Sequence, residues 1–593
     1  MANETCIRDP VHNYIYLTEV ESQLVKHPLF QRLRFITQNG AVYYTYPSNR
    51  NCRFLHSLGC MILGGDIFLS ATENLNDQDV VSYLLTAYSI INSVCTDHLT
   101  VKINDVVKKY AERKDKTFIR YGLDLGIVEN NVDDYNLGPT VKIRFAKAVL
   151  FQSIRLACVL HDIGHFPFSH SLESAIGQYV AHMQSTDTGN EIFLNFEKLQ
   201  SDVEMEIHEN IGIEILDVVI PSSENAFHKL CRYLARTILT EKPSEYQSIV
   251  RPLTKIVSGE LDADRMDYCM RDPRASGLEL GAFDIERIVD NFTLIKDGES
   301  YEILPRVQAL SAIESFYHQR YLLYKYLIYH HSKVRMDEIV KEITRELFHC
   351  YLSGRKPIRQ ILEDYCFSFL WQKYGSEDYY YCNENWFYSL LQSIYLNIRT
   401  IKVPDAGTDR LKQLIEIFLF RKTESVFSFF KRYDQYRDFM NDIISNVRNN
   451  SKKKLPANAD EKAMLLKLRG VIESSISYNN AEEIKKEIFH RHKAICLIAI
   501  LKPKGIKYEQ DGDSRLRVIQ ENTDTGKTPI PISKVSPYIH SLNATFRADQ
   551  FLHIFIVHQD IKKDVTLRNL IRQELIDFFS KKYREVLLDD NHD

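Results

Sequence analysis

Hydrophobic residues recur at helical intervals along most of this chain, which predicts a mostly α-helical fold. Near the N-terminus, Val20, Leu24, Leu29, Leu33 and Ile36 follow this spacing. Residues 146–160 are apolar with the same period, so we expect a buried helix that delivers His161 at its end. Helical patterning continues over residues 204–345 and again over 339–478.

The last hundred residues have a different pattern. Short apolar runs at 495–501, 516–520 and 551–557 are typical of strands, and residues 566–583 are typical of a closing helix. A turn is expected at 510–513, and a short hairpin or an irregular break at 294–305. We therefore expect a core at 1–345, with a polar insertion at about 97–142, a helical extension at 346–480 and a small α+β lobe at 481–593.

Composition narrows the class of protein only slightly. Hydrophobic residues make up 44% of the chain and charged residues 26%, as is usual for a globular protein. A net charge of −4 gives no overall basic field for nucleic acid. No apolar run approaches the roughly 18–20 residues that span a bilayer, so no membrane association is expected. The eleven cysteines form no C-x-x-C motif and no signal peptide is evident, which favours reduced thiols and a cytoplasmic location.

Three distant segments carry the residue types of a metal site. His56 follows Arg53 in an Arg-Phe-Leu-His-Ser motif, His161-Asp162 forms a doublet, and Asp264 lies in Leu-Asp-Ala-Asp-Arg-Met-Asp-Tyr. Divalent cations such as Mg, Mn, Fe or Zn take imidazole and carboxylate ligands. A lone His-Asp pair is common by chance, but the ordered set predicts a cation site with open positions for water and phosphate. Its ligands would be His56, His161, Asp162 and Asp264.

A second group of histidines surrounds this doublet. His165 follows His161 by four residues, so both would face the same side if the helix continued. Histidines paired with a carboxylate handle protons near neutral pH. We therefore predict catalytic roles for His165, His170, Glu173 and His208, with helix capping as the alternative for His170 and Glu173.

Cationic and polar residues near these motifs are suited to a phosphorylated ligand. Guanidinium groups bind phosphate oxygens in a bidentate manner, which assigns Arg53, Arg265 and Arg320 to phosphate unless they are solvated surface residues. Tyr268 and Asp272 lie about one and two helical turns after Asp264, where they would contact a phosphate and a sugar hydroxyl.

The chain resembles the HD-domain deoxynucleoside triphosphate triphosphohydrolases in these motifs. It also shares with them the sequence Ile-Arg-Asp-Pro-Val-His at 7–12 and the segment 28–34. The most similar branch is that of the vertebrate SAM-and-HD-domain enzyme, although no SAM domain precedes the core here. The resemblance covers about residues 5–335. It implies a helical HD metallohydrolase core and hydrolysis of a dNTP to a deoxynucleoside and inorganic triphosphate. It also implies a homo-oligomer, as a dimer, tetramer or hexamer.

The resemblance also implies roles for single residues. The metal ligands match His56, His161, Asp162 and Asp264, and the catalytic histidine matches His165. Gln38 joins Asp272 at the sugar. We count Tyr324 and His330 with the substrate-binding residues, beside Arg53, Arg265, Tyr268 and Arg320.

Several positions depart from the family pattern. Asn39 stands where a leucine is usual, and Ile328 where a tyrosine contacts the sugar, so the choice between deoxyribose and ribose stays open. Glu173 replaces an aspartate. In the activator site of the vertebrate enzyme, an acidic residue recognises guanine. Lys26 occupies that position here, so we expect no activation by GTP.

Two other functions stay open. One is an HD-type phosphodiesterase or nuclease acting on another nucleotide or on single strands. The other is a nucleotide- or nucleic-acid-binding module with residual activity, which would use Lys452–Lys454 and the C-terminal lobe. The leading hypothesis is the triphosphohydrolase, which by lowering dNTP pools would act in nucleotide balance or antiviral defence.

Overall fold

The computed structural model describes residues 5–112, 115–125, 138–183, 192, 194–196, 206–220, 225–240, 246–372, 374–402, 404–450, 461–475, 478–502, 504–508, 513–522 and 526–589. The described chain is mostly helical with four small sheets, which confirms the predicted fold class. The Lys452–Lys454 run and parts of the 97–142 and 510–513 segments lie outside the described residues.

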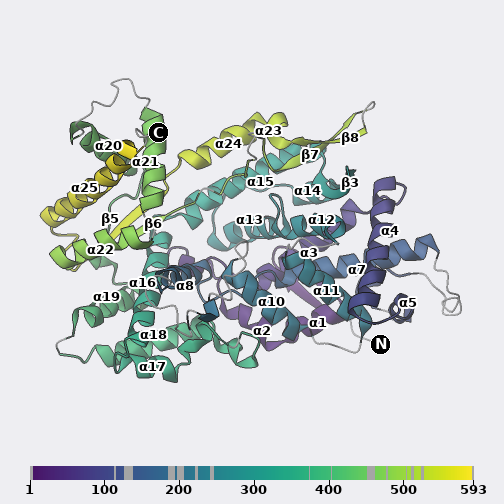
Figure 1. The fold of residues 1–593 in the computed structure, drawn as a ribbon, viewed down its shortest axis with the longest axis horizontal. Coiled ribbons are helices and arrows are strands. Elements are labelled where there is room, and N and C mark those ends of the chain that lie inside the picture. Colours follow the sequence, from purple (N-terminus) through teal and green to yellow (C-terminus); the bar gives the residue numbers. More distant parts are fainter. Residues whose placement is uncertain are drawn as a thin grey trace.

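The first part of the chain is a bundle of helices with two hairpins (Figure 1). Its elements are β1 (Thr5–Asp9), β2 (Asn13–Leu17), α1 (Glu19–Lys26), α2 (Pro28–Gln31), α3 (Arg53–Ala71), α4 (Gln78–Ser93), α5 (Ile103–Glu112), α6 (Lys116–Arg120), α7 (Pro139–Leu160), α8 (His170–Met183), α10 (Ile207–Val219), α11 (Ala226–Thr240), α12 (Gln247–Ser258), α13 (Ala263–Ser276), α14 (Ile285–Asp290), β3 (Phe292–Asp297), β4 (Ser300–Pro305), α15 (Leu310–Leu323) and α16 (His331–Leu352).

The rest of the chain adds helices and a three-stranded antiparallel sheet in the order β5-β9-β6. Its elements are α17 (Ile358–Asp364), α18 (Glu384–Ile398), α19 (Ala406–Phe420), β5 (Val426–Ser428), α20 (Tyr433–Asn450), α21 (Glu461–Ser475), α22 (Tyr478–His492), β6 (Ile495–Ile500), β7 (Arg517–Asn522), β8 (Gly526–Pro531), α23 (Ile532–Val535), α24 (Pro537–Ala548), β9 (Leu552–Val557) and α25 (Val565–Asp589).

Helix α3 lies at the centre of the first part, against α7 and α13 (Figure 1). Two glycines allow this close approach. A Cβ on Gly59 would lie 1.9 Å from Asp267 Oδ1, and a Cβ on Gly64 would lie 2.3 Å from Cys158 Sγ. His56 lies on α3, Asp264 lies on α13, and the His161-Asp162 doublet directly follows α7, so the packing of these helices brings the three motifs together.

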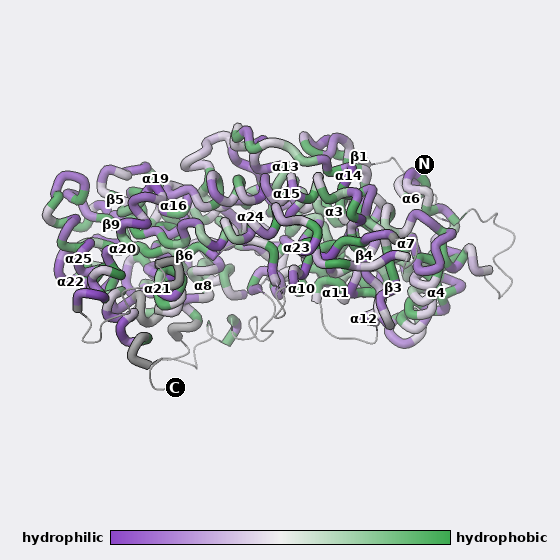
Figure 2. Tube along the Cα trace, turned by 90° about the horizontal axis from the view of Figure 1, so that it is seen from above, coloured by the Kyte–Doolittle hydropathy of each residue, from purple (hydrophilic) through white to green (hydrophobic). Residues whose placement is uncertain are grey.

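The C-terminal elements surround a hydrophobic core of their own. Phe439, Ile443, Ile554, Ile571 and Phe579 are buried in it, between α20, α25 and the sheet. Seen from above, the molecule is elongated, with α22 and α25 at one end and α4 and α6 at the other (Figure 2). The β7–β8 hairpin and α24 instead pack against the first part of the chain, where Val518 and Phe546 join its core.

The three strands expected near the C-terminus are confirmed. They are β6 (expected at 495–501), β7 (516–520) and β9 (551–557). The hairpin expected at 294–305 is confirmed as β3–β4. The hairpin β1–β2, at residues 5–17, was not foreseen. The division at 345 and 480 stays a prediction.

One described helix, α3, is long and apolar enough to cross a membrane by length and composition. However, 78% of that apolar window is buried inside the structure, as in a core helix. All eleven cysteines carry free thiols, as expected.

Candidate functional site

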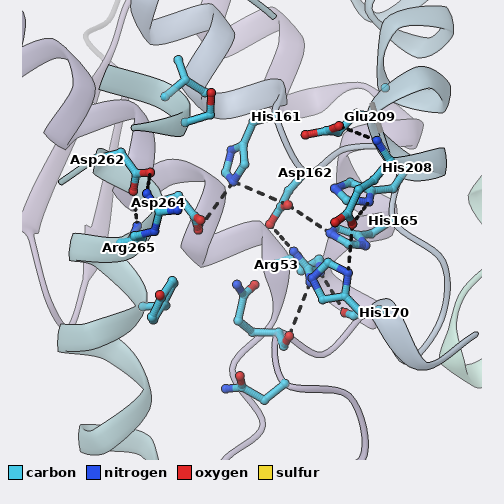
Figure 3. Close-up of a pocket in the computed structure, with 18 of the residues that line it drawn as sticks. Arg53, His161, Asp162, His165, His170, His208, Glu209, Asp262, Asp264 and Arg265 are labelled. Carbon is cyan, nitrogen blue, oxygen red and sulfur yellow. Dashed lines mark hydrogen bonds and ion pairs between the residues drawn. The ribbon is translucent and has the colours of Figure 1, made fainter. Parts of the chain in front are cut away.

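The three motifs meet at a cavity of about 630 Å³, within the size range of ligand-binding pockets (Figure 3). The end of α7, the start of α13, one face of α15 and the Gln38–Gly40 segment form its walls. Of the sixteen residues that the sequence singled out, thirteen line this cavity. His56 and Glu173 lie behind the wall, in contact with residues that line it, and His330 lies elsewhere.

The four residues predicted as metal ligands come together at the bottom of the cavity. His56 Nε2 lies 3.0 Å from Asp264 Oδ1 and 3.5 Å from Asp162 Oδ2. His161 Nε2 lies 3.5 Å from Asp162 Oδ1 and 3.8 Å from Asp264 Oδ1. The buried thiol of Cys60 is also close, 3.5 Å from His56 Nε2, and burial raises its pKa, so it stays protonated.

The hydrogen bonds of the two histidines fix which nitrogen faces this group. His56 donates through Nδ1 to Asp267 Oδ2 at 2.8 Å, and His161 donates through Nδ1 to the Cys158 carbonyl at 2.6 Å. Each Nε2 therefore presents a lone pair to carboxylate oxygens, an arrangement that is repulsive unless a proton or a cation lies between them. Histidine metal ligands are oriented in the same way, so the residues present fit a divalent cation.

Asp267, which orients His56, belongs to a buried ionic network. His12 Nε2 lies 2.7 Å from its Oδ1, and Arg271 binds both Asp267 and Asp9 at 2.8 Å. Although burial opposes ionisation, the Arg271 guanidinium holds the pKa of Asp267 well below its usual range. The sequence analysis quoted Asp267 in its motif but gave it no role. Its position three residues after Asp264, on the same face of the helix, was the available signal.

A second cluster joins Glu173 with His165, His170 and His208. Figure 3 labels the three histidines. The rings of His165 and His208 stack at 3.7 Å with an angle of 14° between their planes. The Glu173 carboxylate lies 2.9 Å from His208 Nδ1, and it lies 3.3 Å from His170 Nδ1. Burial opposes charge on His208, but Glu173 raises its pKa to about 9. Burial, and then the positive charges of Arg53 and His208, lower the pKa of His165 well below its usual range.

His165 does not lie on a continuation of the α7 helix, which ends at Leu160. The chain turns instead and places His165 Nε2 3.1 Å from Asp162 Oδ1 rather than beside His161. Phe168 and Ser169, farther along this turn, adopt the left-handed conformation with φ of 58° and 55°. Neither residue is a glycine or an asparagine, so the sequence did not mark these two positions as left-handed.

Glu384, at the start of α18, holds two loops of the site in place. Its Oε1 accepts hydrogen bonds from the Thr37 amide at 2.8 Å, the Thr37 hydroxyl at 2.6 Å and the Phe168 amide at 3.3 Å. Ser169 extends the connection, because its hydroxyl donates to the Thr37 carbonyl and accepts from Arg53 Nε. Arg53 in turn forms an ion pair with Asp162. The sequence analysis missed Glu384, for which no local motif exists.

The residues predicted to bind phosphate line the wall beside Asp264. Arg265 forms an ion pair with Asp262 at 2.6 Å, and Arg320 Nε donates to the Tyr268 hydroxyl at 2.9 Å. The Arg320 guanidinium also lies 5.5 Å from the Tyr324 ring centroid. Among the described residues, Arg320 Nη1 is buried without a hydrogen-bond partner, as are His161 Nε2, His165 Nδ1 and Gln38 Oε1. Buried polar atoms without partners at a cavity wall are available to a ligand.

The two remaining residues that were predicted to bind substrate, Asp272 and His330, differ in their positions. Asp272 lines the cavity, where burial raises its pKa to about 6 and Asn51 donates to it at 3.3 Å. His330 instead caps α16 through a hydrogen bond from the Ser332 amide, with its ring 5.9 Å from that of Tyr46. Asn39 and Ile328, the departures from the family pattern, both line the cavity. So do Lys504 and Lys507 of the C-terminal part, which the sequence analysis did not select.

Comparison with known proteins gives distant relatives. No known family model matches the chain. It is 26% identical over 343 residues to the uncharacterized protein MJ1154 of Methanocaldococcus jannaschii, covering 57% of this chain and 49% of that protein. It is 22% identical over 341 residues to the deoxynucleoside triphosphate triphosphohydrolase SAMHD1 of Gallus gallus, covering 56% of this chain and 43% of that protein. The chain thus spans about half the length of these curated relatives.

A solved structure resembles nearly the whole chain. The phosphohydrolase of Bacteroides thetaiotaomicron VPI-5482 superposes with a TM-score of 0.51 at 18% identity, covering 94% of this chain and all of the other. The two proteins therefore share a fold. The resemblance to the HD-domain triphosphohydrolases that the motifs predicted is thereby confirmed.

Proposed function

We propose that this relative of the HD-domain triphosphohydrolases hydrolyses (deoxy)nucleoside triphosphates to the (deoxy)nucleoside and inorganic triphosphate. The observation that carries the proposal is the arrangement at one cavity: two histidines and two aspartates converge beside Arg53, Arg265 and Arg320. A site for a divalent cation next to several guanidinium groups suits a polyphosphate ester, since both neutralise phosphate charge.

The cation would be held by His56, His161, Asp162 and Asp264. When bound, such a cation supplies Lewis-acid chemistry, which activates water and neutralises charge on the attacked phosphoryl group. The protein orients this site through Asp267 and the Cys158 carbonyl, and through Arg53, which fixes Asp162.

We assign the triphosphate to the wall formed by Arg265, Tyr268 and Arg320, and the sugar to Gln38 and Asp272. In this orientation the α-phosphorus faces the predicted metal ligands, and the bond that breaks joins it to the sugar O5′. The unpartnered Arg320 Nη1 and Gln38 Oε1 would then gain hydrogen-bond partners from the substrate.

The leaving sugar oxygen needs a proton. His208 is the protonated histidine of the second cluster, because Glu173 raises its pKa to about 9. His165 lies between His208 and Asp162, stacked on the first and 3.1 Å from the second. We therefore assign the proton supply to His208 with Glu173 and His170, and contact with the reacting phosphate to His165.

The proposal is tested by incubating the purified protein with each dNTP and NTP, with Mg²⁺ or Mn²⁺, and separating the products. Nucleoside and inorganic triphosphate in equal amounts support it. Release of a nucleoside monophosphate and pyrophosphate, or of orthophosphate, would contradict it.

A second candidate function is an HD-type phosphodiesterase acting on another nucleotide. Asn39 and Ile328 favour it, because both line the cavity where the family carries residues selective for deoxyribose. The same incubation, repeated with cyclic nucleotides and short single-stranded nucleic acids, shows which class of substrate the protein hydrolyses. The resemblance also leads us to propose a homo-oligomer, which sedimentation velocity would test.

A further inference from the structure

Two lysines of the C-terminal part reach the cavity and have no role in the reaction described above. Lys504 and Lys507 both line the cavity, and both are exposed. Among the described residues, neither forms an ion pair with a carboxylate. The segment that carries them joins β6 to the β7–β8 hairpin and lies beyond the region that resembles the family.

The described backbone of this segment is fixed by hydrogen bonds rather than free in solvent. The Tyr329 hydroxyl donates to the Lys502 carbonyl, and Asn543 Nδ2 donates to the Ile506 carbonyl at 3.0 Å. The Arg515 amide donates to the Lys507 carbonyl at 2.9 Å. Gly505 packs so closely on Asn543 that a Cβ would lie 1.8 Å from its Oδ1. The two lysines therefore project from a defined position at the rim.

Contacts between side chains locate this position near the phosphate wall. Tyr329, which binds the segment, packs its ring 5.3 Å from that of Tyr324. Tyr324 in turn lies under the Arg320 guanidinium. The segment that carries the lysines thus lies on the side of the cavity that holds Tyr324 and Arg320.

We propose that Lys504 and Lys507 bind the outer phosphates of a polyphosphate group and thereby favour triphosphates over shorter phosphate chains. This inference rests on the proposed function, since it extends the substrate site of that reaction. Asp262 offsets part of the charge of Arg265, so the two unpaired lysines add positive charge for a triphosphate beyond that of Arg265 and Arg320. Ammonium groups on flexible stems suit the mobile terminal phosphates, whereas the guanidinium groups fix the inner ones.

The test is calorimetric binding of inorganic tripolyphosphate to the full chain, with orthophosphate and a nucleoside as separate ligands. The double variant Lys504→Gln/Lys507→Gln should bind tripolyphosphate about tenfold more weakly, with little change for orthophosphate or the nucleoside. Lys502→Gln is the matched control, because Lys502 lies on the same exposed segment but does not line the cavity. The control should bind as the wild type does.

The inference is overturned if the double variant binds tripolyphosphate as tightly as the wild type, if the wild type does not bind it, or if nucleoside binding weakens instead. Both variants are compared by thermal unfolding, so that a folding defect is recognised. If this defect appears, Lys504→Arg/Lys507→Arg must retain binding. Because binding needs no turnover, lysine-dependent binding without hydrolysis would count against the proposed function and not against this inference.

Discussion

Asp267 accepts a hydrogen bond from His56 Nδ1 at 2.8 Å, across the contact between α13 and α3. This bond turns His56 Nε2 toward Asp264, the orientation in which a neutral imidazole can bind a cation. The close approach depends on Gly59, so fold and site are linked at this point.

Replacing Asp267 by asparagine should therefore weaken metal binding by about 10- to 100-fold, since the amide no longer fixes the proton on Nδ1. Metal content after dialysis against graded chelator concentrations measures the effect. The exposed Glu286, changed to glutamine, is the control and should leave the metal content unchanged. Equal retention of metal by Asp267→Asn and the wild type would contradict the assigned role.

Glu384 should act on activity through the loops that it holds. Glu384→Ala should lower kcat/KM by roughly tenfold because Thr37 and Phe168 lose their shared acceptor and the loops shift. Glu384→Gln keeps an acceptor oxygen and should recover most of this loss. The neighbouring exposed Glu377→Gln should have no effect. If glutamine is as harmful as alanine, the acceptor role is wrong.

The same carboxyl should make stability depend on pH. Burial raises the pKa of Glu384 to about 7, above the ordinary 4.5. Between these values the folded state keeps a proton that the unfolded state releases, so this contribution to stability falls as the pH rises from about 4.5 through 7. The melting temperature of the wild type, relative to Glu384→Gln, should therefore decrease from pH 5 to pH 8. A constant difference would show that Glu384 has an ordinary pKa.

Asn39 should influence the choice of sugar. Its amide lines the cavity where an apolar side chain would exclude a 2′-hydroxyl. Asn39→Leu should raise the ratio of kcat/KM for a dNTP to that for the matching NTP by roughly tenfold. Kinetics with dATP and ATP measure this ratio. If the ratio of the two kcat/KM values is unchanged, other residues select the sugar, and Ile328→Tyr is the next variant to measure.

The sequence predicted which residues converge at the cavity better than it predicted how the chain arranges them. His56, His161, Asp162 and Asp264 could be found because each belongs to a motif, and the helical period placed the helices that carry them. The turn after His161 could not be predicted, because its left-handed residues are Phe168 and Ser169. Glu384 and Lys504 reach the site only through packing between distant parts of the chain, which no local pattern records.

GTP should not activate the enzyme in the manner of the vertebrate family member. Lys26, at the position where that family's activator site carries an acidic residue, is exposed at the end of α1. A lysine cannot accept hydrogen bonds from the guanine edge. Titration of GTP during dNTP hydrolysis measures this, and strong guanine-specific stimulation would refute the prediction.

The most direct test of the central claim compares the wild type with the double variant His161→Ala/Asp162→Ala. Both proteins are measured for bound divalent metal and for release of inorganic triphosphate from dNTPs. The account predicts metal and triphosphate release in the wild type and loss of both in a variant that remains folded. A folded variant that still releases triphosphate at the wild-type rate would contradict it.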